Sequence, residues 1–317
     1  MRLPTPRGEL TEQLVGVLSA GSAPVTSLTA TATDETDHQL ALWILHELHY
    51  RGFEETSDAL EWDPDLIRLR GSLERQLEAC LRAAVADDLA AATEQGTDLT
   101  TRLEHLTRDQ PGRLAEHLAR EASIDQFREF LVQRSIYHLK ESDPHAWALP
   151  RLEGAAKVAL AELLYDEYGA GVPERLHSRL FADALRAMGM DATYGAYIDD
   201  ASWQTLAVNN TMTMFGLHRR FRGAVMGHLA AFEMTSSLPA RRIAQGADRL
   251  SLDAAVVAYY DEHVEADAVH EHVAAGICAS LVEDDPVVAD DVLFGAAACV
   301  ELDRLAAQVL LTRWRVA

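Results

Sequence analysis

The stretch of residues 259–270, YYDEHVEADAVH, constrains this chain more than any other. No glycine or proline interrupts it, so it is predicted to be helical. His263, Asp267 and His270 then stand at positions i, i+4 and i+7, within about 60° of one another around the helix axis. The same side of this helix is predicted to carry the apolar or small residues Val256, Tyr259, Tyr260, Ala266, Ala274 and Ile277. Two imidazoles and a carboxylate therefore occupy a face that normally packs against a core.

Burial of these three polar groups costs several kcal/mol unless a partner compensates them. A metal ion would pair with all three, because imidazole nitrogens and carboxylate oxygens are ligands for first-row metals. A single histidine on an apolar face is more often a core residue satisfied by hydrogen bonds. The His-x-x-x-Asp-x-x-His pattern on one face instead favours a metal site.

The composition argues against several classes of partner. The 317 residues include 28 basic and 50 acidic ones, which gives a net charge of −22. Such a surface repels phosphate backbones, so we expect no nucleic-acid partner, and no basic amphipathic helix indicates membrane binding. The N-terminus lacks an apolar leader, and no run approaches about 18 apolar residues, which predicts a cytoplasmic protein. Cys80, Cys278 and Cys299 form no CxxC pair and are expected to be buried thiols.

Helical periodicity runs through most of the chain. Residues 1–33 are rich in Ser, Thr, Ala, Gly and Pro, and we expect a flexible N-terminus there. From residue 34 onward, apolar residues recur at spacings of three and four, without the sustained alternation of β-strands. Besides the helix containing 259–270, helices are predicted over 65–95, 99–107, 113–140, 151–168, 173–189, 202–215, 218–237 (ended by Pro239) and 286–314. The fold class is therefore predicted to be all-α, a bundle of about ten helices.

Three further predicted helices place metal-binding residue types on their apolar sides. These residues are Glu167 in the helix 151–168, Glu174 and His177 in 173–189, and Glu233 in 218–237. His228 is expected on the far side of its helix. Helical bundles that hold two metal ions use this arrangement, in which carboxylates bridge the ions and histidines complete the coordination. The mixed carboxylate and imidazole set favours iron or manganese, whereas independent buried ion pairs would be a costly alternative.

The segment His46-Glu47-Leu48-His49 offers two more histidines at positions i and i+3. Glu47 is predicted to point away from both of them. We therefore expect this segment to line a helix interface or a substrate entrance rather than to bind a metal.

The spacing of the candidate ligands resembles that of the haem-oxygenase-like di-iron oxygenases. In that family a Glu and a His on core helices are followed by a second Glu and then by a His-x-x-x-Asp-x-x-His helix. Here His177 follows Glu167 by 10 residues, Glu233 follows His177 by 56, and His263 follows Glu233 by 30. The sequence looks most like an actinobacterial branch described as iron-containing redox enzymes. The resemblance covers about residues 120–317, so we expect a helical extension at 34–112 and a haem-oxygenase-like di-iron domain at 113–317.

The resemblance implies two Fe(II) ions, with Mn as an alternative metal, O2 as co-substrate and no haem. It implies the ligand set Glu167, His177, Glu233, His263, Asp267 and His270. Some members carry the first glutamate three residues before the histidine, where this chain has Glu174. Glu174 could replace Glu167, join it as a seventh ligand, or simply be a first-turn carboxylate favoured by the helix dipole.

The resemblance further implies an enzyme that uses O2 to oxidise a small amine, amino acid or carboxylic acid. The reaction would be an N-oxygenation or an oxidative cleavage or desaturation. Tyr259, Tyr260 and Arg241 are candidates for contacts with this small-molecule substrate. Two alternatives stay open: a non-catalytic metal-binding protein that stores iron or regulates a partner, and a metal-free hydrolase or haem protein on the same scaffold. The apolar N-terminal helices suggest a homodimer.

Overall fold

The computed structural model describes residues 1–20, 31–108 and 112–316, and for Ala20 and residues 265–268 it describes the backbone alone. Within these residues the chain forms fourteen α-helices and several short 3-10 turns, and no strand is present. The predicted all-α class is therefore confirmed. Among the described helices, none combines the length and the apolar character that a membrane crossing requires.

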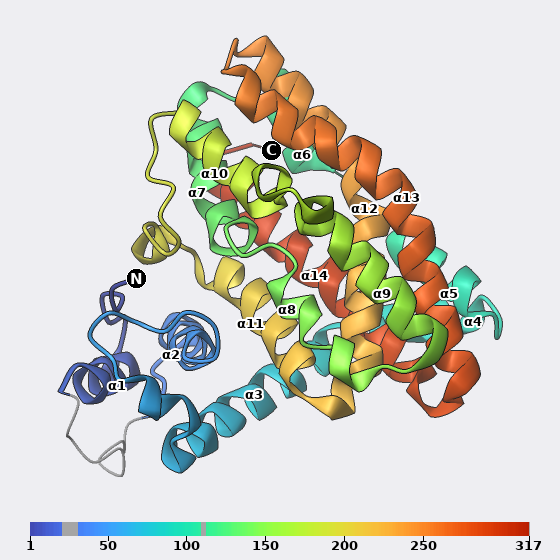
Figure 1. Ribbon diagram of the computed structural model, residues 1–317, viewed down its shortest axis with the longest axis horizontal. Coiled ribbons are helices and arrows are strands. Elements are labelled where there is room, and N and C mark those ends of the chain that lie inside the picture. Colours follow the sequence, from blue (N-terminus) through green and yellow to red (C-terminus); the bar gives the residue numbers. More distant parts are fainter. Residues whose placement is uncertain (21–30, 109–111, 317) are drawn as a thin grey trace.

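The N-terminal third forms five helices that lie against one end and one side of the bundle (Figure 1). They are α1 (Glu9–Ala20), α2 (Glu35–Glu47), α3 (Pro64–Ala84), α4 (Ala86–Glu94) and α5 (Leu99–Thr107). The expectation of a flexible N-terminus is wrong for α1, which buries Leu10, Leu14 and Leu18. The carboxylate of Asp37 accepts hydrogen bonds from the amides of Leu10 and Thr11, which satisfies two of the free N–H groups in the first turn of α1. Residues 21–30 lie outside the described part of the chain.

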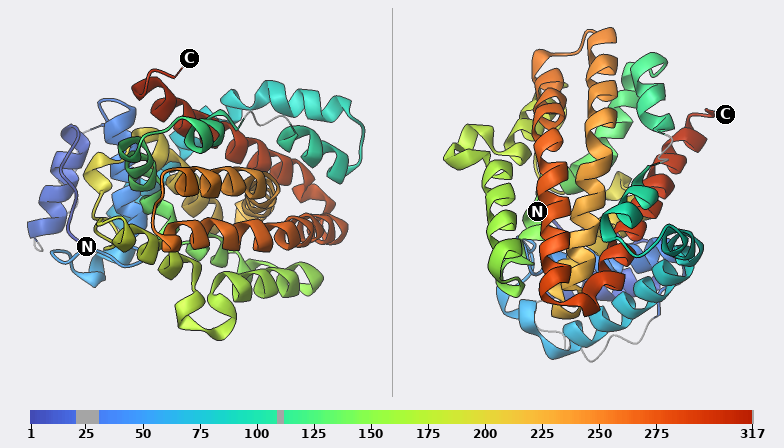
Figure 2. Two further views of the ribbon diagram at one scale, coloured as in Figure 1. Left: turned by 90° about the horizontal axis from the view of Figure 1, so that it is seen from above. Right: turned by 90° about the vertical axis from the view of Figure 1, so that its right-hand side faces the viewer.

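The remaining helices build the bundle that carries the candidate site. They are α6 (Arg113–Arg120), α7 (Ile124–His138), α8 (Asp143–Ala146), α9 (Gly154–Glu167), α10 (His177–Ala187), α11 (Trp203–Leu217), α12 (Arg222–Arg249), α13 (Ala254–Asp284) and α14 (Ala289–Arg313). The long helix α12 packs against both α13 and α14, and α9 and α10 pack on α13 (Figure 2). This arrangement places the inner faces of α9, α10, α12 and α13 opposite one another.

Several predicted helices are split in the structure. Val85 divides the predicted helix 65–95 into α3 and α4. Ser123 divides 113–140, because its hydroxyl and the side chain of Gln126 form a capping box that starts α7 afresh. Residues 173–189 begin with a 3-10 turn, and α10 starts only at His177. Apolar periodicity continues across such breaks, which is why it did not reveal them.

Pro239 was expected to end a helix, but α12 continues through it to Arg249. A proline inside a helix costs about 3 kcal/mol, because it removes one backbone hydrogen bond and crowds the preceding turn. The turns beyond Pro239 bury Ala240, Ile243 and Ala247 against the bundle. Tertiary burial of these side chains offsets the local cost, so the helix stays intact.

The three cysteines are free. Cys278 and Cys299 are buried as expected, and burial raises the pKa of Cys278 to about 12. Cys80 differs from the expectation, because it is exposed on α3.

Two glycines set the close approach of α12 to α14. A Cβ atom added at Gly227 would lie 1.8 Å from the carbonyl oxygen of Val292, and one added at Gly295 would lie 1.9 Å from that of Ala224. No side chain fits between the two backbones at these points. The absence of a side chain thus fixes the position of α12, which carries Glu233 into the candidate site.

We expect Gly227→Ala to lower the free energy of unfolding by about 3 kcal/mol, at the upper end of the cost of overpacking, because the methyl group meets rigid backbone. Gly276→Ala on α13 is the matched control. It has open space around the new Cβ and should gain about 0.5–1 kcal/mol from helix propensity. Urea unfolding followed by circular dichroism measures both values. Equal stabilities of the two variants would contradict the proposed role of Gly227.

A buried histidine pair joins α8 to α12. His145 Nε2 lies 3.3 Å from His228 Nδ1, and both side chains are buried. Burial lowers the pKa of His145 to about 4, and burial followed by the neighbouring His145 lowers the pKa of His228. Both imidazoles are therefore neutral at pH 7. As expected, His228 lies away from the candidate ligands.

This pair predicts a loss of stability in mild acid. The unfolded pKa of histidine is about 6.5, above the folded value of His145, so the unfolded state binds more protons between these pH values. Lowering the pH from 6.5 to 4 should remove about 3 kcal/mol through His145. Over this pH range the free energy of unfolding of His145→Asn should fall less steeply than that of the wild type. His272→Asn, at an exposed site, should follow the wild type. Identical pH profiles for His145→Asn and the wild type would refute this account.

Candidate metal centre

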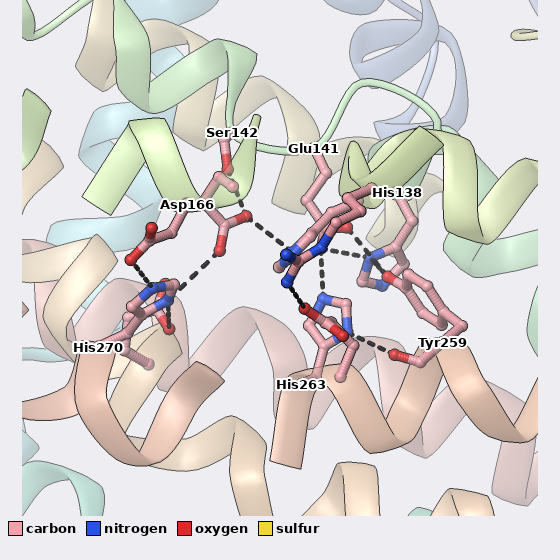
Figure 3. A network of polar contacts seen from close by, with 12 residues as sticks. His138, Glu141, Ser142, Asp166, Tyr259, His263 and His270 are labelled. Atoms are coloured by element: carbon pink, nitrogen blue, oxygen red, sulfur yellow. Dashed lines mark hydrogen bonds and ion pairs between the residues drawn. The ribbon is translucent and has the colours of Figure 1, made fainter. Parts of the chain in front are cut away.

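Two groups of three side chains meet between the inner faces of the helices (Figure 3). The first group consists of Glu141, His177 and His263, and the second of Glu167, Glu233 and His270. In each group, one nitrogen or carboxylate oxygen from every residue lies within 4.8 Å of the others. Each group has the size and the donor types of a metal site.

Glu167 connects the two groups. Its Oε2 lies 3.3 Å from His177 Nδ1 in the first group, and its Oε1 lies 3.3 Å from His270 Nδ1 in the second. Two ligands about 2.1 Å from one ion and at right angles are about 3 Å apart, so these separations suit a shared ion on each side. One carboxylate thus faces two possible metal positions.

The local structure explains how each side chain reaches the centre. Glu167 is the last residue of α9, and His177 is the first residue of α10. Glu233 lies in the middle of α12, while His263 and His270 lie two turns apart on α13. Glu141 comes from the turn between α7 and α8.

Neighbouring groups orient the candidate ligands. His263 Nδ1 lies 2.7 Å from the backbone oxygen of Tyr259, to which it donates, and its Nε2 faces Glu141 Oε1 at 3.5 Å. Ser142 Oγ donates to Glu167 Oε2 at 2.7 Å. Such outer contacts fix the tautomer of a histidine ligand and the rotamer of a carboxylate ligand.

The electrostatics favour ionised carboxylates despite their burial. Burial alone would raise the pKa of Glu167, but the neighbouring imidazoles of His177 and His270 outweigh it and lower that pKa. In the same way the charges of His138 and His263 lower the pKa of Glu141. Burial acts against protonation of His270, yet contacts with Glu167 and Glu233 raise its pKa to about 10. Acid groups in this state are ready to bind a cation, which would displace protons from the histidines.

Two buried nitrogen atoms fit a metal better than they fit hydrogen bonds. His177 Nδ1 and His270 Nδ1 face Glu167, but neither makes a well-aligned hydrogen bond within the described part of the chain. A buried polar atom without such a bond costs about 1–3 kcal/mol. A metal ion between these nitrogens and the carboxylate would remove that cost. The residues present therefore fit the metal site that the sequence predicted.

The structure brings together five of the seven candidate ligands, namely Glu167, His177, Glu233, His263 and His270. Asp267 lies on α13, but its side chain is outside the described residues. Glu174 is exposed and belongs to neither group. The reason is the extended backbone of Leu176 (ψ 125°), which separates the turn containing Glu174 from α10 and breaks the helical face that the two residues were predicted to share.

The candidate substrate residues have different surroundings. The hydroxyl of Tyr259 donates to Glu141 Oε2 at 3.0 Å and lies 2.7 Å from His138 Nδ1, so this residue supports the first group from the side. Tyr260 is buried, and its hydroxyl has no hydrogen-bond partner within the described residues. Arg241 is exposed on α12, about 12 Å along the helix from Glu233.

Glu141 was missed by sequence reasoning. It follows the end of α7 in a turn, so no helical periodicity marks it. Its position three residues after His138 was the available signal, because these two side chains bond to each other at 2.8 Å.

A surface pocket reaches the centre. It has a volume of about 260 Å³ and touches one histidine from each group, His177 and His270. Its other lining residues are Asp166, Gly169, Ala170, Arg175, Glu262 and Val269. Asp166 Oδ2 lies 3.6 Å from His270 Nε2, and Arg175 pairs with Glu262 at 3.6 Å. The pocket suits a small molecule that carries charge.

Comparison with known proteins agrees with this geometry. The family model of iron-containing redox enzymes matches residues 128–304, more than half of the chain. Two solved structures of a CADD-like protein of unknown function from Nostoc punctiforme are similar in fold. One has 17% sequence identity and a TM-score of 0.53, covering 68% of this chain and 94% of that one. The other has 18% identity and a TM-score of 0.50, covering 75% and 97%. No curated protein is significantly similar in sequence.

Divalent metal should stabilise the folded chain, because it binds the assembled groups and not the unfolded state. At 100 times the dissociation constant, each occupied site adds about 2.7 kcal/mol to the free energy of unfolding. Glu167→Gln should abolish most of this gain, since Glu167 faces both groups, whereas Glu233→Gln should remove about half. Thermal unfolding with and without Mn(II) measures the effect. A Glu167→Gln variant that gains as much as the wild type would rule out the shared role of this carboxylate.

Proposed function

Because the chain belongs to the iron-containing redox enzyme family of the haem-oxygenase-like superfamily, we propose that it is a non-haem di-iron oxidase or oxygenase. The observation that carries the proposal is the position of Glu167, whose two oxygens face a histidine of each group at 3.3 Å. A carboxylate shared in this way is the usual bridge between two metal ions in a helical bundle.

The proposed assignment of ligands follows the two groups. Glu141, His177 and His263 would hold one Fe(II), and Glu233 and His270 the other, with Glu167 between them. Asp267 joins this set on the resemblance alone. When bound, the two Fe(II) ions would supply the electrons with which O2 is reduced.

The protein's own contribution is to orient the ligands and exclude water. The ring centroids of Phe181 and Tyr259 lie 5.1 Å apart in a buried wall beside the first group. Tyr259 and His138 both hydrogen-bond to Glu141. They can therefore hold a proton beside this carboxylate during the reaction. A site whose ligands are buried and oriented in advance strengthens electrostatic interactions during the reaction.

The substrate that we propose is a small amine, amino acid or carboxylic acid. Arg175 replaces Arg241 as the candidate partner of a substrate carboxylate, because Arg175 lines the pocket and Arg241 does not. Asp166 and Glu262 line the same pocket and could receive a substrate ammonium group. The small volume of the pocket favours substrates with few atoms.

The proposal is tested by loading the metal-free protein with Fe(II) without oxygen and then adding O2 with a panel of amines, amino acids and carboxylic acids. We expect two iron ions per chain and O2 consumption that depends on one substrate class. His263→Ala should lower the rate at least about 100-fold, because loss of a direct ligand costs more than loss of an outer-sphere partner. The exposed His272→Ala on the same helix is the matched control and should behave as the wild type.

Different results separate the alternatives. Two bound irons without O2 consumption across the panel would favour the non-catalytic metal-binding protein. One iron per chain or none would exclude the di-iron assignment. Both readouts use the same protein samples, so they can be compared directly.

A further inference from the structure

The turn between α7 and α8 serves the first group of the candidate centre. Glu141 belongs to this group, and the next residue, Ser142, donates to Glu167 Oε2, the oxygen that faces His177 of the same group. The residue before them, Lys140, is only 2% exposed. A buried lysine beside a candidate metal ligand needs a partner, because an isolated buried charge is costly.

That partner is Glu47 at the end of α2. Lys140 Nζ donates to Glu47 Oε1, and Glu47 is fully buried. The hydroxyl of Tyr194 donates to the same oxygen at 2.7 Å, and Lys140 Nζ lies 4.1 Å from the ring centroid of Tyr50. The ion pair is therefore enclosed by aromatic rings, where a low local dielectric strengthens it.

Arg51, four residues after Glu47, contacts both flanks of the same turn. Its guanidinium donates to the backbone oxygen of Leu139 at 3.4 Å and lies 3.9 Å from the carboxylate of Asp143. Glu47 thus contacts the turn at Lys140, and Arg51 contacts it on both sides of Lys140. Both lie outside the region that the family model matches.

The turn has a backbone conformation that must be held by its surroundings. Ser142 has a φ of 68°, in the left-handed region that non-glycine residues rarely adopt. Its amide donates to the hydroxyl of Tyr137 at 3.3 Å. Backbone strain of this kind costs about 1–3 kcal/mol and persists where neighbouring contacts fix it.

We propose that Glu47 is a positioning residue for the metal ligand Glu141, acting through its buried ion pair with Lys140. The inference rests on the proposed di-iron function. It means that α2, from the N-terminal helices, forms part of the support of the metal centre. Loss of the Glu47 charge would leave Lys140 buried and unpaired, and loss of the whole ion pair would remove the directed contact that ties the turn to α2. In both cases the turn would shift and would carry Glu141 with it.

The test is a metal titration of Glu47→Gln. Anaerobic Fe(II) and, separately, Mn(II) are added to metal-free protein, and binding is followed by calorimetry. We expect one of the two sites to weaken by about 10–100-fold, the usual effect of losing an outer-sphere partner, while the other site keeps its affinity. A merely structural role would not produce this difference between the two sites.

Glu78→Gln is the matched control. Glu78 also joins the N-terminal helices to the bundle, through an ion pair with Arg220 at 2.7 Å, but it is only partly buried, and its partners Arg82 and Arg220 lie outside the turn. This variant should bind both metals as the wild type does. The double variant Glu47→Leu with Lys140→Met removes both charges together, which protects the fold against an unpaired buried lysine. It should unfold at the same temperature as the wild type and still show one weakened site.

The outcomes distinguish this inference from the proposed function. A wild type that binds no metal would refute the di-iron function itself. A wild type with two sites, together with a folded double variant of unchanged affinities, would overturn the role of Glu47 alone. Equal weakening of both sites in the folded double variant would also overturn it.

Discussion

The structure depends on pairing the charged groups that it buries around Glu167. This carboxylate lies within 3.3 Å of histidines from α10 and α13 and accepts a hydrogen bond from Ser142. Each of these groups would be costly to bury alone. Four helices and one turn must therefore come together at the same point, and this requirement fixes their relative positions more narrowly than apolar packing would.

The rest of the bundle provides the rigidity that such a centre needs. The backbones of α12 and α14 are in direct contact at Gly227 and Gly295, so α12 cannot move closer to α14 or rotate freely. This contact fixes the position of Glu233 on α12. Next to it, the neutral pair of His145 and His228 fixes α8 against α12. Histidines thus serve two purposes here. His177, His263 and His270 face the carboxylates of the two groups and are candidates for metal binding, whereas His145 and His228 contact each other and belong to the scaffold.

Sequence reasoning succeeded where a residue stands in the middle or at the end of a regular helix. His263, His270, Glu233 and Glu167 could be assigned to buried faces because helical geometry relates each of them to its apolar neighbours. The all-α class followed from the same periodicity.

It failed where the backbone leaves the helix. Glu174 was placed beside His177 by a helical arc that the extended Leu176 interrupts. Glu141 was missed because a turn has no period from which its orientation can be inferred. Pro239 was misjudged for a different reason, since the burial that keeps α12 intact comes from partners far away in the chain.

Buried polar contacts join the N-terminal helices to the bundle. The N-terminal helices were predicted to be an extension that ends at residue 112, outside the region resembling the family. Yet Glu74 of α3 is buried and lies 3.1 Å from His46 of α2 and 2.8 Å from His218, which precedes α12. Burial would raise the pKa of Glu74, but these histidines lower it, so the carboxylate is held as an anion between the two regions.

A removable cap would not be expected to share such groups with the domain that it covers. Separating α3 from the bundle would expose Glu74 and leave its histidine partners to find new ones, and separating α2 would break the pair of Glu47 with Lys140. Buried charge pairs add little net stability, but breaking one by removal of a partner costs several kcal/mol. The N-terminal helices and the bundle are therefore expected to fold as one cooperative unit, and the candidate metal centre lies inside that unit.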